Sequence, residues 1–262
     1  MNNIAIIDLD SLAFYAGYGN KVINTQTQEP ERDGDGRLIL VDKTTKELEE
    51  SCDYLMNKLL QDSKADSYIA LIKGKGNYRK DISSTYKANR PEEPPKWWKT
   101  VKDYLISKWG ANEINNIEVD DAVNILKNNY KDTGFICAID RDLLGLEGKH
   151  FNWSKNEWIE TSKDQAAYKF WEDMIAGQKG DNISGIPKKG AKFVEKLFKD
   201  VGIASYPHLV FREYLVYYGL DEGIKQYYIN YNLLKILDNS TMNDLYLIQP
   251  IKVQIPENNF TI

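Results

Sequence analysis

A chain of 262 residues with 42% hydrophobic residues can bury one large core, or one core and a smaller second one, so we expect one or two domains. The net charge of −5 argues against a protein that coats nucleic acid with its whole surface. No run of about 18 apolar residues and no signal-peptide pattern occur, so we expect a cytoplasmic protein without a membrane span. Cys52 and Cys137 lie in apolar surroundings without metal-ligand spacing, which predicts buried thiols rather than a disulfide or a zinc site.

Short apolar runs alternate with helical patterns in the first half of the chain. The apolar runs predict buried strands over residues 4–8, 68–72, 113–117 and 135–139. Apolar residues at three- and four-residue steps predict helices over residues 46–62, 97–109 and 120–129. This alternation is typical of the α/β class, a mostly parallel central sheet flanked by helices.

Two other stretches depart from the alternation. Residues 20–42 are polar and predict a hairpin excursion, in which Asp33-Gly34-Asp35-Gly36 forms a turn rather than a calcium loop, because the bidentate Glu of such a loop is absent. After residue 161 the chain becomes mainly helical and rich in Tyr. We therefore place a domain boundary near residue 160, with an α/β region over 1–160 and a mainly helical region over 161–262.

Basic residues are concentrated in two segments. Residues 73–102 carry nine Lys or Arg and three Asp or Glu, a local charge of +6, and residues 188–199 carry five against one, a charge of +4. Segments of this kind are typical of contacts with phosphate groups. A solvated basic helix is the simpler alternative for the second segment.

Acidic residues follow three of the predicted strands: Asp8, then Glu118, Asp120 and Asp121, then Asp140 and Asp142. Because the carboxyl ends of parallel strands meet at one edge of a sheet, we expect these six acids to converge. Helix capping or solvation would explain any one of them alone. Together they would repel one another, and bound cations most readily offset that repulsion. All-oxygen ligands select hard ions, so Mg²⁺ or Mn²⁺ is expected, in a pair that could promote phosphodiester cleavage.

Five segments match one family in order and spacing: Ile6-Ile7-Asp8, Tyr86-Lys87-Ala88-Asn89-Arg90, Glu118-Val119-Asp120-Asp121, Asp140-Arg141-Asp142-Leu143, and Gly180-Asp181-Asn182-Ile183-Ser184-Gly185-Ile186-Pro187 with Gly190-Ala191-Lys192. Over residues 4 to about 200 the chain resembles the 5′-nuclease family, particularly its phage 5′-3′ exonuclease and flap endonuclease branches. The resemblance implies a PIN-like nuclease core, an arch or gateway over about 76–110 and a helix-hairpin-helix over about 174–200. It also implies metal-dependent hydrolysis of phosphodiester bonds near DNA 5′ ends.

The resemblance implies roles for individual residues. The metal ligands, direct or through water, would be Asp8, Glu118, Asp120, Asp140, Asp142 and Asp181, with Asp121 in support. The catalytic set would add two cations that grip the scissile phosphate, Lys87 and Arg90. Further DNA contacts would come from Tyr86, Arg79, Gly185, Gly190, Lys188, Lys189 and Lys192. Tyr86 would either stack on a terminal base or pack on the sheet.

The resemblance also implies partners and ions. The substrate would be duplex DNA with a free 5′ end, a flap or a nick, or an RNA–DNA hybrid, bound by a monomer in the cytoplasm of a bacterium or of a phage-infected host. Two Mg²⁺ or Mn²⁺ ions would serve the reaction. A K⁺ ion at the helix-hairpin-helix is a further implication.

The chain departs from the family pattern at two acids and in the hairpin. The family usually carries an Asp at the end of the second core strand, but no acid occurs between Ser67 and Lys80. Gln178 stands where an acid is usual before the hairpin, and Lys188 and Lys189 replace a Gly followed by an apolar residue, which puts the K⁺ site in doubt. Fewer charges lower cation affinity. A degenerate nuclease that binds branched DNA with weak or no cleavage is therefore an alternative, and a PIN-like ribonuclease is a third that leaves the hairpin unexplained.

Overall fold

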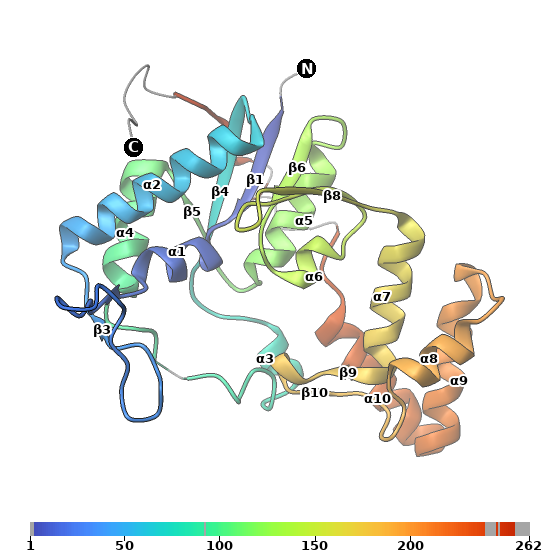
Figure 1. Cartoon of the computed structure of the whole chain (residues 1–262). Helices are drawn as coiled ribbons and strands as arrows, with labels where there is room; N and C mark the ends of the chain where they lie inside the picture. Colours follow the sequence, from blue (N-terminus) through green and yellow to red (C-terminus); the bar gives the residue numbers. More distant parts are fainter. Residues whose placement is uncertain (1–2, 92, 239–244, 246, 255–262) are drawn as a thin grey trace.

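The computed structural model describes residues 3–91, 93–238, 245 and 247–254. A seven-stranded sheet has the order β11-β4-β1-β6-β7-β8, with β5 also paired with β4 (Figure 1). Its strands are β1 (Ile4–Asp8), β4 (Ser67–Lys73), β5 (Asn112–Ile114), β6 (Gly134–Cys137), β7 (Gly148–Asn152), β8 (Glu157–Thr161) and β11 (Ile251–Lys252). The strands β8 and β11 pair antiparallel with their neighbours, and all other pairs in this sheet are parallel. The predicted α/β class is confirmed.

Helices cover both faces of the sheet. One face is covered by α1 (Leu9–Gly17), α2 (Thr45–Ser63) and α4 (Trp98–Trp109), and the other by α5 (Val119–Asn129). The helices predicted over 46–62, 97–109 and 120–129 agree with the last three to within one residue at each end. The start of α2 is fixed by a capping box, in which Thr44 and Glu47 each bond to the other's backbone N–H.

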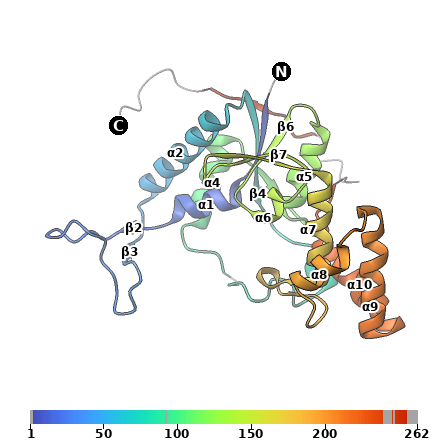
Figure 2. The same ribbon diagram turned by 45° about the vertical axis from the view of Figure 1, so that its right-hand side comes forward.

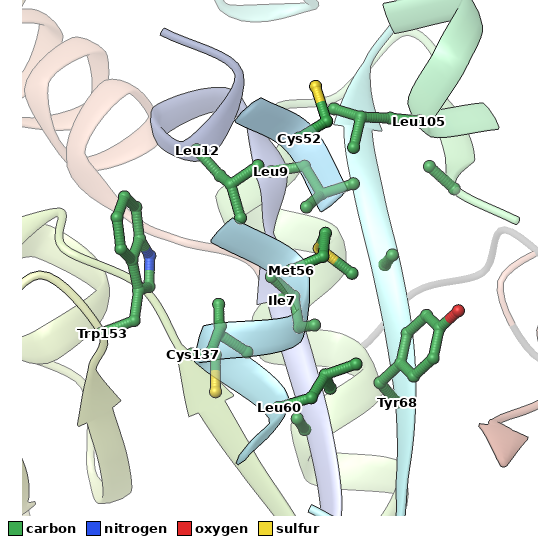
Figure 3. Packing of buried hydrophobic residues seen from close by; sticks show 14 of the residues in the cluster. Ile7, Leu9, Leu12, Cys52, Met56, Leu60, Tyr68, Leu105, Cys137 and Trp153 are labelled. Carbon is green, nitrogen blue, oxygen red and sulfur yellow. The ribbon is translucent and has the colours of Figure 1, made fainter. Parts of the chain in front are cut away.

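The strands supply both cores because successive side chains point to opposite faces. Ala5 and Ile7 of β1 pack in the core under α1, α2 and α4, whereas Ile4 and Ile6 pack against α5. Figure 3 shows Ile7 in the first of these cores. Cys137 lies in the first of these cores, and both cysteines of the chain are buried free thiols, as predicted. With both faces covered, only the strand ends and the loops that follow them can present functional groups.

The segment between β4 and α4 crosses below the sheet, and its described residues form a single short helix, α3 (Arg79–Ile82) (Figure 1). The arch predicted over 76–110 is therefore too long. Val101 and Leu105 of α4 are fully buried in the core with α1 and α2, so α4 belongs to the α/β core rather than to an arch. Trp97 also packs on this core, where it contacts Phe14 edge to face.

Two hairpins leave or extend the sheet. The predicted excursion is present, with β2 (Asn20–Lys21) antiparallel to β3 (Leu40–Val41), and it projects away from the molecule in Figure 2. Its tip is the predicted turn, closed by backbone N–H groups of residues 35 and 37 that donate to the Asp33 carboxylate. The hairpin of β7 and β8 was not predicted, because its outer strand is exposed and carries no continuous apolar run.

The helices α7 (Lys163–Ala176), α8 (Ala191–Phe198), α9 (Tyr206–Tyr218) and α10 (Leu220–Leu234) pack around a third core beside the sheet (Figure 2). Tyr214 lies fully buried within it and donates to the Met174 carbonyl. The predicted division at residue 160 is incomplete, since β11 returns to pair with β4. The end of the predicted second region, residues 255–262, lies outside the described residues. Within the described part of the chain, no helix is long and apolar enough to cross a membrane.

Candidate active site

The acids predicted at the strand ends lie at one edge of the sheet. Asp8 ends β1 and caps α1 by accepting from the Asp10 N–H at 2.9 Å. Asp140 follows β6 and caps α6 (Arg141–Leu144) in the same way, from the Asp142 N–H at 2.8 Å. Asp120 lies in the first turn of α5. Capping and convergence therefore occur together, because a helix that starts at a strand end carries its capping carboxylate to the shared edge.

These carboxylates perturb one another's ionisation. Burial raises the pKa of Asp8 well above its usual range, and the nearby carboxylates of Asp10 and Asp140 raise it further. Burial, followed by the charges of Asp8 and Asp140, has the same effect on the pKa of Asp120. The pKa of Asp142 is raised to about 6 by burial and by Asp140. The edge thus holds negative charge that costs free energy and that a cation would relieve.

The donor set fits a hard divalent ion, although it is open. Among the described residues, no group of three or more Asp, Glu, His or Cys side chains is arranged to hold a metal ion by itself. Mg²⁺ does not require such a set, since it usually keeps several waters and is held by one or two carboxylates. Crowded carboxylate oxygens with raised pKa values suit that mode of binding, in which water completes the coordination.

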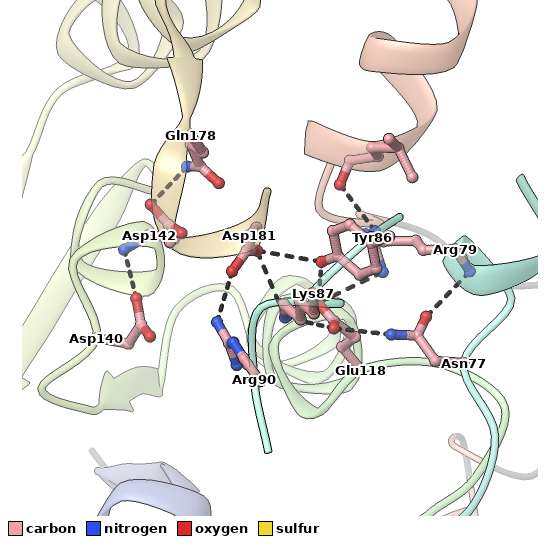
Figure 4. A network of polar contacts seen from close by, with 12 residues as sticks. Asn77, Arg79, Tyr86, Lys87, Arg90, Glu118, Asp140, Asp142, Gln178 and Asp181 are labelled. Atoms are coloured by element: carbon pink, nitrogen blue, oxygen red, sulfur yellow. Dashed lines mark hydrogen bonds and ion pairs between the residues drawn. The ribbon is translucent and has the colours of Figure 1, made fainter. Parts of the chain in front are cut away.

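A second group of acids, Glu118 and Asp181, is paired with cations (Figure 4). Lys87 contacts Glu118 at 2.5 Å and Asp181 at 3.5 Å, and Arg90 contacts Asp181 at 2.5 Å. Burial alone would raise the pKa of Glu118, but the Lys87 ammonium and its hydrogen bond bring it below the usual value. The structure thus places the two predicted phosphate-gripping cations directly at the acidic edge.

Tyr86 is buried and ties these two acids together. Its hydroxyl donates to Glu118 at 3.0 Å and to Asp181 at 3.2 Å, and its ring packs with Ile183 and Leu233. Only 2% of Tyr86 is exposed, which is incompatible with the predicted stacking on a terminal base. The ring also packs with Ile183 and Leu233 rather than on the sheet, which was the alternative prediction. Tyr86 thus links the segment after α3 to Asp181, in the segment predicted as a helix-hairpin-helix.

Lys87 has an unusual backbone conformation that fits a constrained site. Its φ of 54° is rare for a residue with a side chain. Its N–H donates to the Asp181 carbonyl at 2.9 Å, and the nearby Asn182 amide donates to the Thr85 carbonyl at 2.8 Å. These contacts with Asp181 and Asn182 therefore fix the backbone conformation in which the Lys87 side chain reaches the acids.

Asp121 and Arg79 have a structural role that differs from the predictions. Arg79 is 1% exposed and forms a bidentate ion pair with the fully buried Asp121 at 2.6 and 2.8 Å. The remaining guanidinium hydrogen bonds go to the carbonyls of Leu233 and Lys235, after or at the end of α10. The prediction that Arg79 contacts DNA is wrong, since its side chain is enclosed. Asp121, predicted to support the metal, instead holds Arg79 and caps α5 through the Glu118 N–H.

Gln178 lies among acids, as its place in the sequence suggested. Its amide donates to Asp142 at 3.0 Å and to Asp173 at 3.1 Å (Figure 4 shows the first of these bonds). Asp173, from the last turns of α7, also pairs with Lys169. Sequence reasoning missed Asp173 because a helical Asp four residues after a Lys resembles an ordinary surface pair. It also missed Asp10, although Asp8 and Asp10 repeat the spacing of Asp140 and Asp142.

The lysines of the predicted helix-hairpin-helix differ in exposure. Lys188 and Lys192 are exposed near the start of α8, which no side chain caps, and a helix N-terminus favours an anion. Lys189 instead pairs with Glu213 of α9 at 2.6 Å and lies over the Phe193 ring, so the prediction that it contacts DNA does not fit.

The predicted DNA contacts at Gly185 and Gly190 have different surroundings. A Cβ on Gly185 would lie 2.1 Å from the Ile175 carbonyl oxygen, so this glycine permits close backbone packing. Gly190 caps α8 in open space. Of the two, only Gly190 lies where a phosphate could approach.

Members of both acid groups line one pocket of about 420 Å³. Its walls include Glu118, Asp120, Asp142 and Asp181, together with residues of α7 and of the segment at the end of α10. A polar substrate group in this pocket can therefore reach Asp120 and Asp142 as well as the cation-paired Glu118 and Asp181.

Comparisons with known proteins agree with this architecture. No model of a known protein family matches the chain. It is 29% identical over 152 residues to a 5′-3′ exonuclease of Buchnera aphidicola subsp. Schizaphis graminum, a match that covers 51% of this chain and 53% of that protein. It is 27% identical over 169 residues to DNA polymerase I of Bacillus caldotenax, covering 56% of this chain and 19% of the polymerase. The chain thus spans about half of the exonuclease and a fifth of the polymerase.

Solved structures show the same fold over most of the chain. The T5 D15 protein co-crystallised with metal ions has a TM-score of 0.56 and 18% identity, covering 90% of this chain and 99% of that one. A complex of the D155K variant of the T5 D15 flap endonuclease with DNA and metal ions has a TM-score of 0.52 and 16% identity, covering 89% and 99%. At these identities the structural match establishes the fold. The sequence matches to proteins named 5′-3′ exonuclease and the structural match to the T5 D15 protein thus make the chain similar to 5′-nucleases in sequence and in fold.

Proposed function

We propose that the chain is a divalent-metal-dependent 5′ nuclease that hydrolyses phosphodiester bonds near DNA 5′ ends, as a 5′-3′ exonuclease or a flap endonuclease. The observation that carries the proposal is the set of mutually repelling carboxylates at the strand ends, next to two cations that reach the same edge. Its sequence relatives named 5′-3′ exonuclease and its T5 structural neighbours with metal ions and DNA support it.

The ligands of the proposed ions would be Asp8, Glu118, Asp120, Asp140, Asp142 and Asp181. Mg²⁺ or Mn²⁺ bound there would lower the pKa of water and neutralise charge on the phosphodiester. The carboxylates themselves orient and hold water at the edge. Gln178, hydrogen-bonded to Asp142, offers a neutral oxygen where the family usually has an acid, so it lowers the charge of the site without removing a donor.

Lys87 and Arg90 would grip the phosphate. A phosphodiester approaching the acids is repelled by them, and the ammonium of Lys87 and the guanidinium of Arg90 offset this repulsion at the entrance. In the transition state the same two groups stabilise the additional negative charge on the phosphate oxygens. Tyr86 holds Glu118 and Asp181 in position for both tasks.

The duplex behind the cleavage site would lie on the predicted helix-hairpin-helix. Lys188, Lys192 and the backbone N–H groups at the start of α8 can contact one DNA strand without reading its sequence. The partner would be a DNA duplex with a free 5′ end, a flap or a nick, or an RNA–DNA hybrid, bound by a monomer in the cytoplasm. A K⁺ ion at the hairpin carbonyls stays a prediction.

One assay tests the proposal against the degenerate-binder alternative, which the open ligand set favours. A 5′-labelled flap, a nicked duplex and an RNA–DNA hybrid are incubated with Mg²⁺, Mn²⁺ or chelator. We expect metal-dependent release of a short labelled product, and we expect Asp140→Asn to reduce it by at least about 100-fold while binding in Ca²⁺ is retained. Binding to the flap without metal-dependent cleavage would establish the binder instead. Equal cleavage by wild type and Asp140→Asn would remove the proposed site.

A further inference from the structure

Asp10 is an acid that reaches from α1 to the neighbouring strand. The strands β1 and β4 are parallel neighbours, with Asp8 beside Leu71, so both end at the acidic edge. Two residues after Asp8, the Asp10 carboxylate accepts a hydrogen bond from the Lys73 N–H at 2.9 Å. Lys73 is the last residue of β4. The Asp10 side chain therefore lies at the tip of the second core strand, although the sequence places it on the first helix.

The Asp10 carboxylate lies at the acidic edge, beside the end of β4, and has no ion-pair partner within the described residues. It lies close enough to Asp8 and Glu118 for their charges to oppose its ionisation. The ammonium groups of Lys73 and Lys102 offset this only at longer range, since no Lys or Arg side-chain nitrogen in the described part of the chain lies within 4.0 Å of it. Lys102 instead bonds to the Lys73 carbonyl at 2.7 Å and to Glu113 at 3.2 Å.

The strand tip that Asp10 reaches is where this chain lacks an acid. No Asp or Glu occurs between Ser67 and Lys80, and a lysine, Lys73, ends the strand. A lysine side chain there cannot serve as a ligand for a cation, but its backbone N–H fixes the Asp10 carboxylate at the same place. The negative charge missing from β4 is thus restored from α1.

We propose that Asp10 supplies, from the first helix, the carboxylate that 5′-nucleases usually take from the end of the second strand, and that it holds a divalent ion together with Asp8. This inference rests on the proposed function. The competing explanation is that Asp10 only fastens the tip of β4 and interacts favourably with the start of α1. The two differ in what they require, because fastening needs an acceptor oxygen whereas ion binding needs the negative charge.

Asp10→Asn separates the two roles. The amide keeps an oxygen that accepts from the Lys73 N–H, but it removes the charge. Mn²⁺ binding to the full chain would be measured by electron paramagnetic resonance and titration calorimetry, without substrate. We expect the affinity for at least one ion to fall by about tenfold or more, since ligand charge count strongly affects affinity. Asp103→Asn, at an exposed acid on α4 paired with Lys99, is the matched control and should bind Mn²⁺ like the wild type.

A rescue variant sharpens the test. In the Asp10→Asn background, Lys73→Asp returns a carboxylate to the end of β4, and we expect it to recover most of the lost Mn²⁺ affinity. Unchanged Mn²⁺ binding by Asp10→Asn would overturn the inference, and so would a loss that Lys73→Asp fails to recover in a protein with normal thermal unfolding. Asp140→Asn keeps this outcome distinct from failure of the proposed function. If Asp140→Asn weakens Mn²⁺ binding and Asp10→Asn does not, only the role of Asp10 is lost.

Discussion

The acids of the candidate site fall into two regions, one in which each carboxylate is paired with a cation and one in which the carboxylates lack such a partner. Around Asp121, Glu118 and Asp181, every carboxylate has a Lys or Arg partner in contact. At the strand ends, Asp8 and Asp120 have no ion-pair contact among the described residues, and burial together with neighbouring acids raises their pKa values. The two regions meet at Glu118, which is paired with Lys87 and also repels Asp120.

The difference separates acids that we expect to stabilise the fold from acids that we propose bind the ions. A buried, fully bonded ion pair makes a rigid junction but has no capacity to bind anything else. Carboxylates left without partners destabilise the fold, and an ion that binds them recovers this cost. Substitutions in the paired region should therefore weaken folding, whereas those in the unpaired region should weaken metal binding and strengthen folding without metal.

The largest effect is expected at the Arg79–Asp121 pair. Arg79→Met leaves the Asp121 carboxylate buried without its cation and removes the bonds to the end of α10, so we expect unfolding free energy to fall by about 3–5 kcal/mol. Urea unfolding followed by circular dichroism measures this change. Lys80→Met, at the exposed neighbour in α3, is the control and should stay within about 0.5 kcal/mol of wild type. Comparable stability of the two variants would break the assignment of Arg79 to a structural junction.

In the unpaired region we expect a substitution to raise the free energy of unfolding instead of lowering it. Asp120→Asn removes a charge that Asp8 and Asp140 repel, so in chelator we expect the variant to be more stable than wild type by about 1 kcal/mol. With saturating Mn²⁺ the order should reverse, since only the wild type gains the full stabilisation from the ion. Thermal unfolding in both conditions is the measurement. A loss of stability in chelator would indicate that Asp120 has a structural partner rather than an unmet charge.

The pH dependence of stability gives a third comparison, at Asp142. Its pKa is raised from 3.8 to about 6, so the folded state holds the proton more tightly than the unfolded state does. The stabilising contribution is fully present below about pH 3.8 and is lost as the pH rises through about 6. In chelator, the melting temperature of Asp142→Asn relative to wild type should therefore increase between pH 4 and pH 7. A difference that stays flat over this range would contradict the raised pKa.

Much of the fold follows from the sequence because it rests on local patterns. Continuous apolar runs identified β1, β4 and β6, and helical periodicity placed α2, α4 and α5 to within one residue. The hairpin of β7 and β8 escaped detection because its outer strand alternates without a continuous apolar run. The return of β11 to β4 joins residues far apart in the sequence, and no local pattern signals it.

The convergence of the acids was predictable from the sequence, and their individual contacts were less so. A strand-end position indicates that an acid reaches the shared edge, which placed Asp8, Asp120 and Asp140 correctly on the same side of the sheet. It does not indicate which acid meets a buried cation, because that depends on long-range packing. The position of Arg79 within a basic segment predicts a phosphate contact, and only the fold shows that its side chain is enclosed with Asp121.

The smallest effect concerns the hairpin, where the same contrast between free and paired charge applies to cations. Lys188 is exposed, whereas Lys189 is held by Glu213. If Lys188 contacts one phosphate, Lys188→Ala should weaken duplex binding equally for all sequences and reduce the slope of log affinity against log salt by about 0.9. Lys189→Ala should leave that slope unchanged and lower the melting temperature instead, because it leaves Glu213 without one of its two cations. Fluorescence anisotropy over a salt series measures the slopes, and an equal slope change in both variants would show that Lys189 leaves Glu213 to bind the duplex.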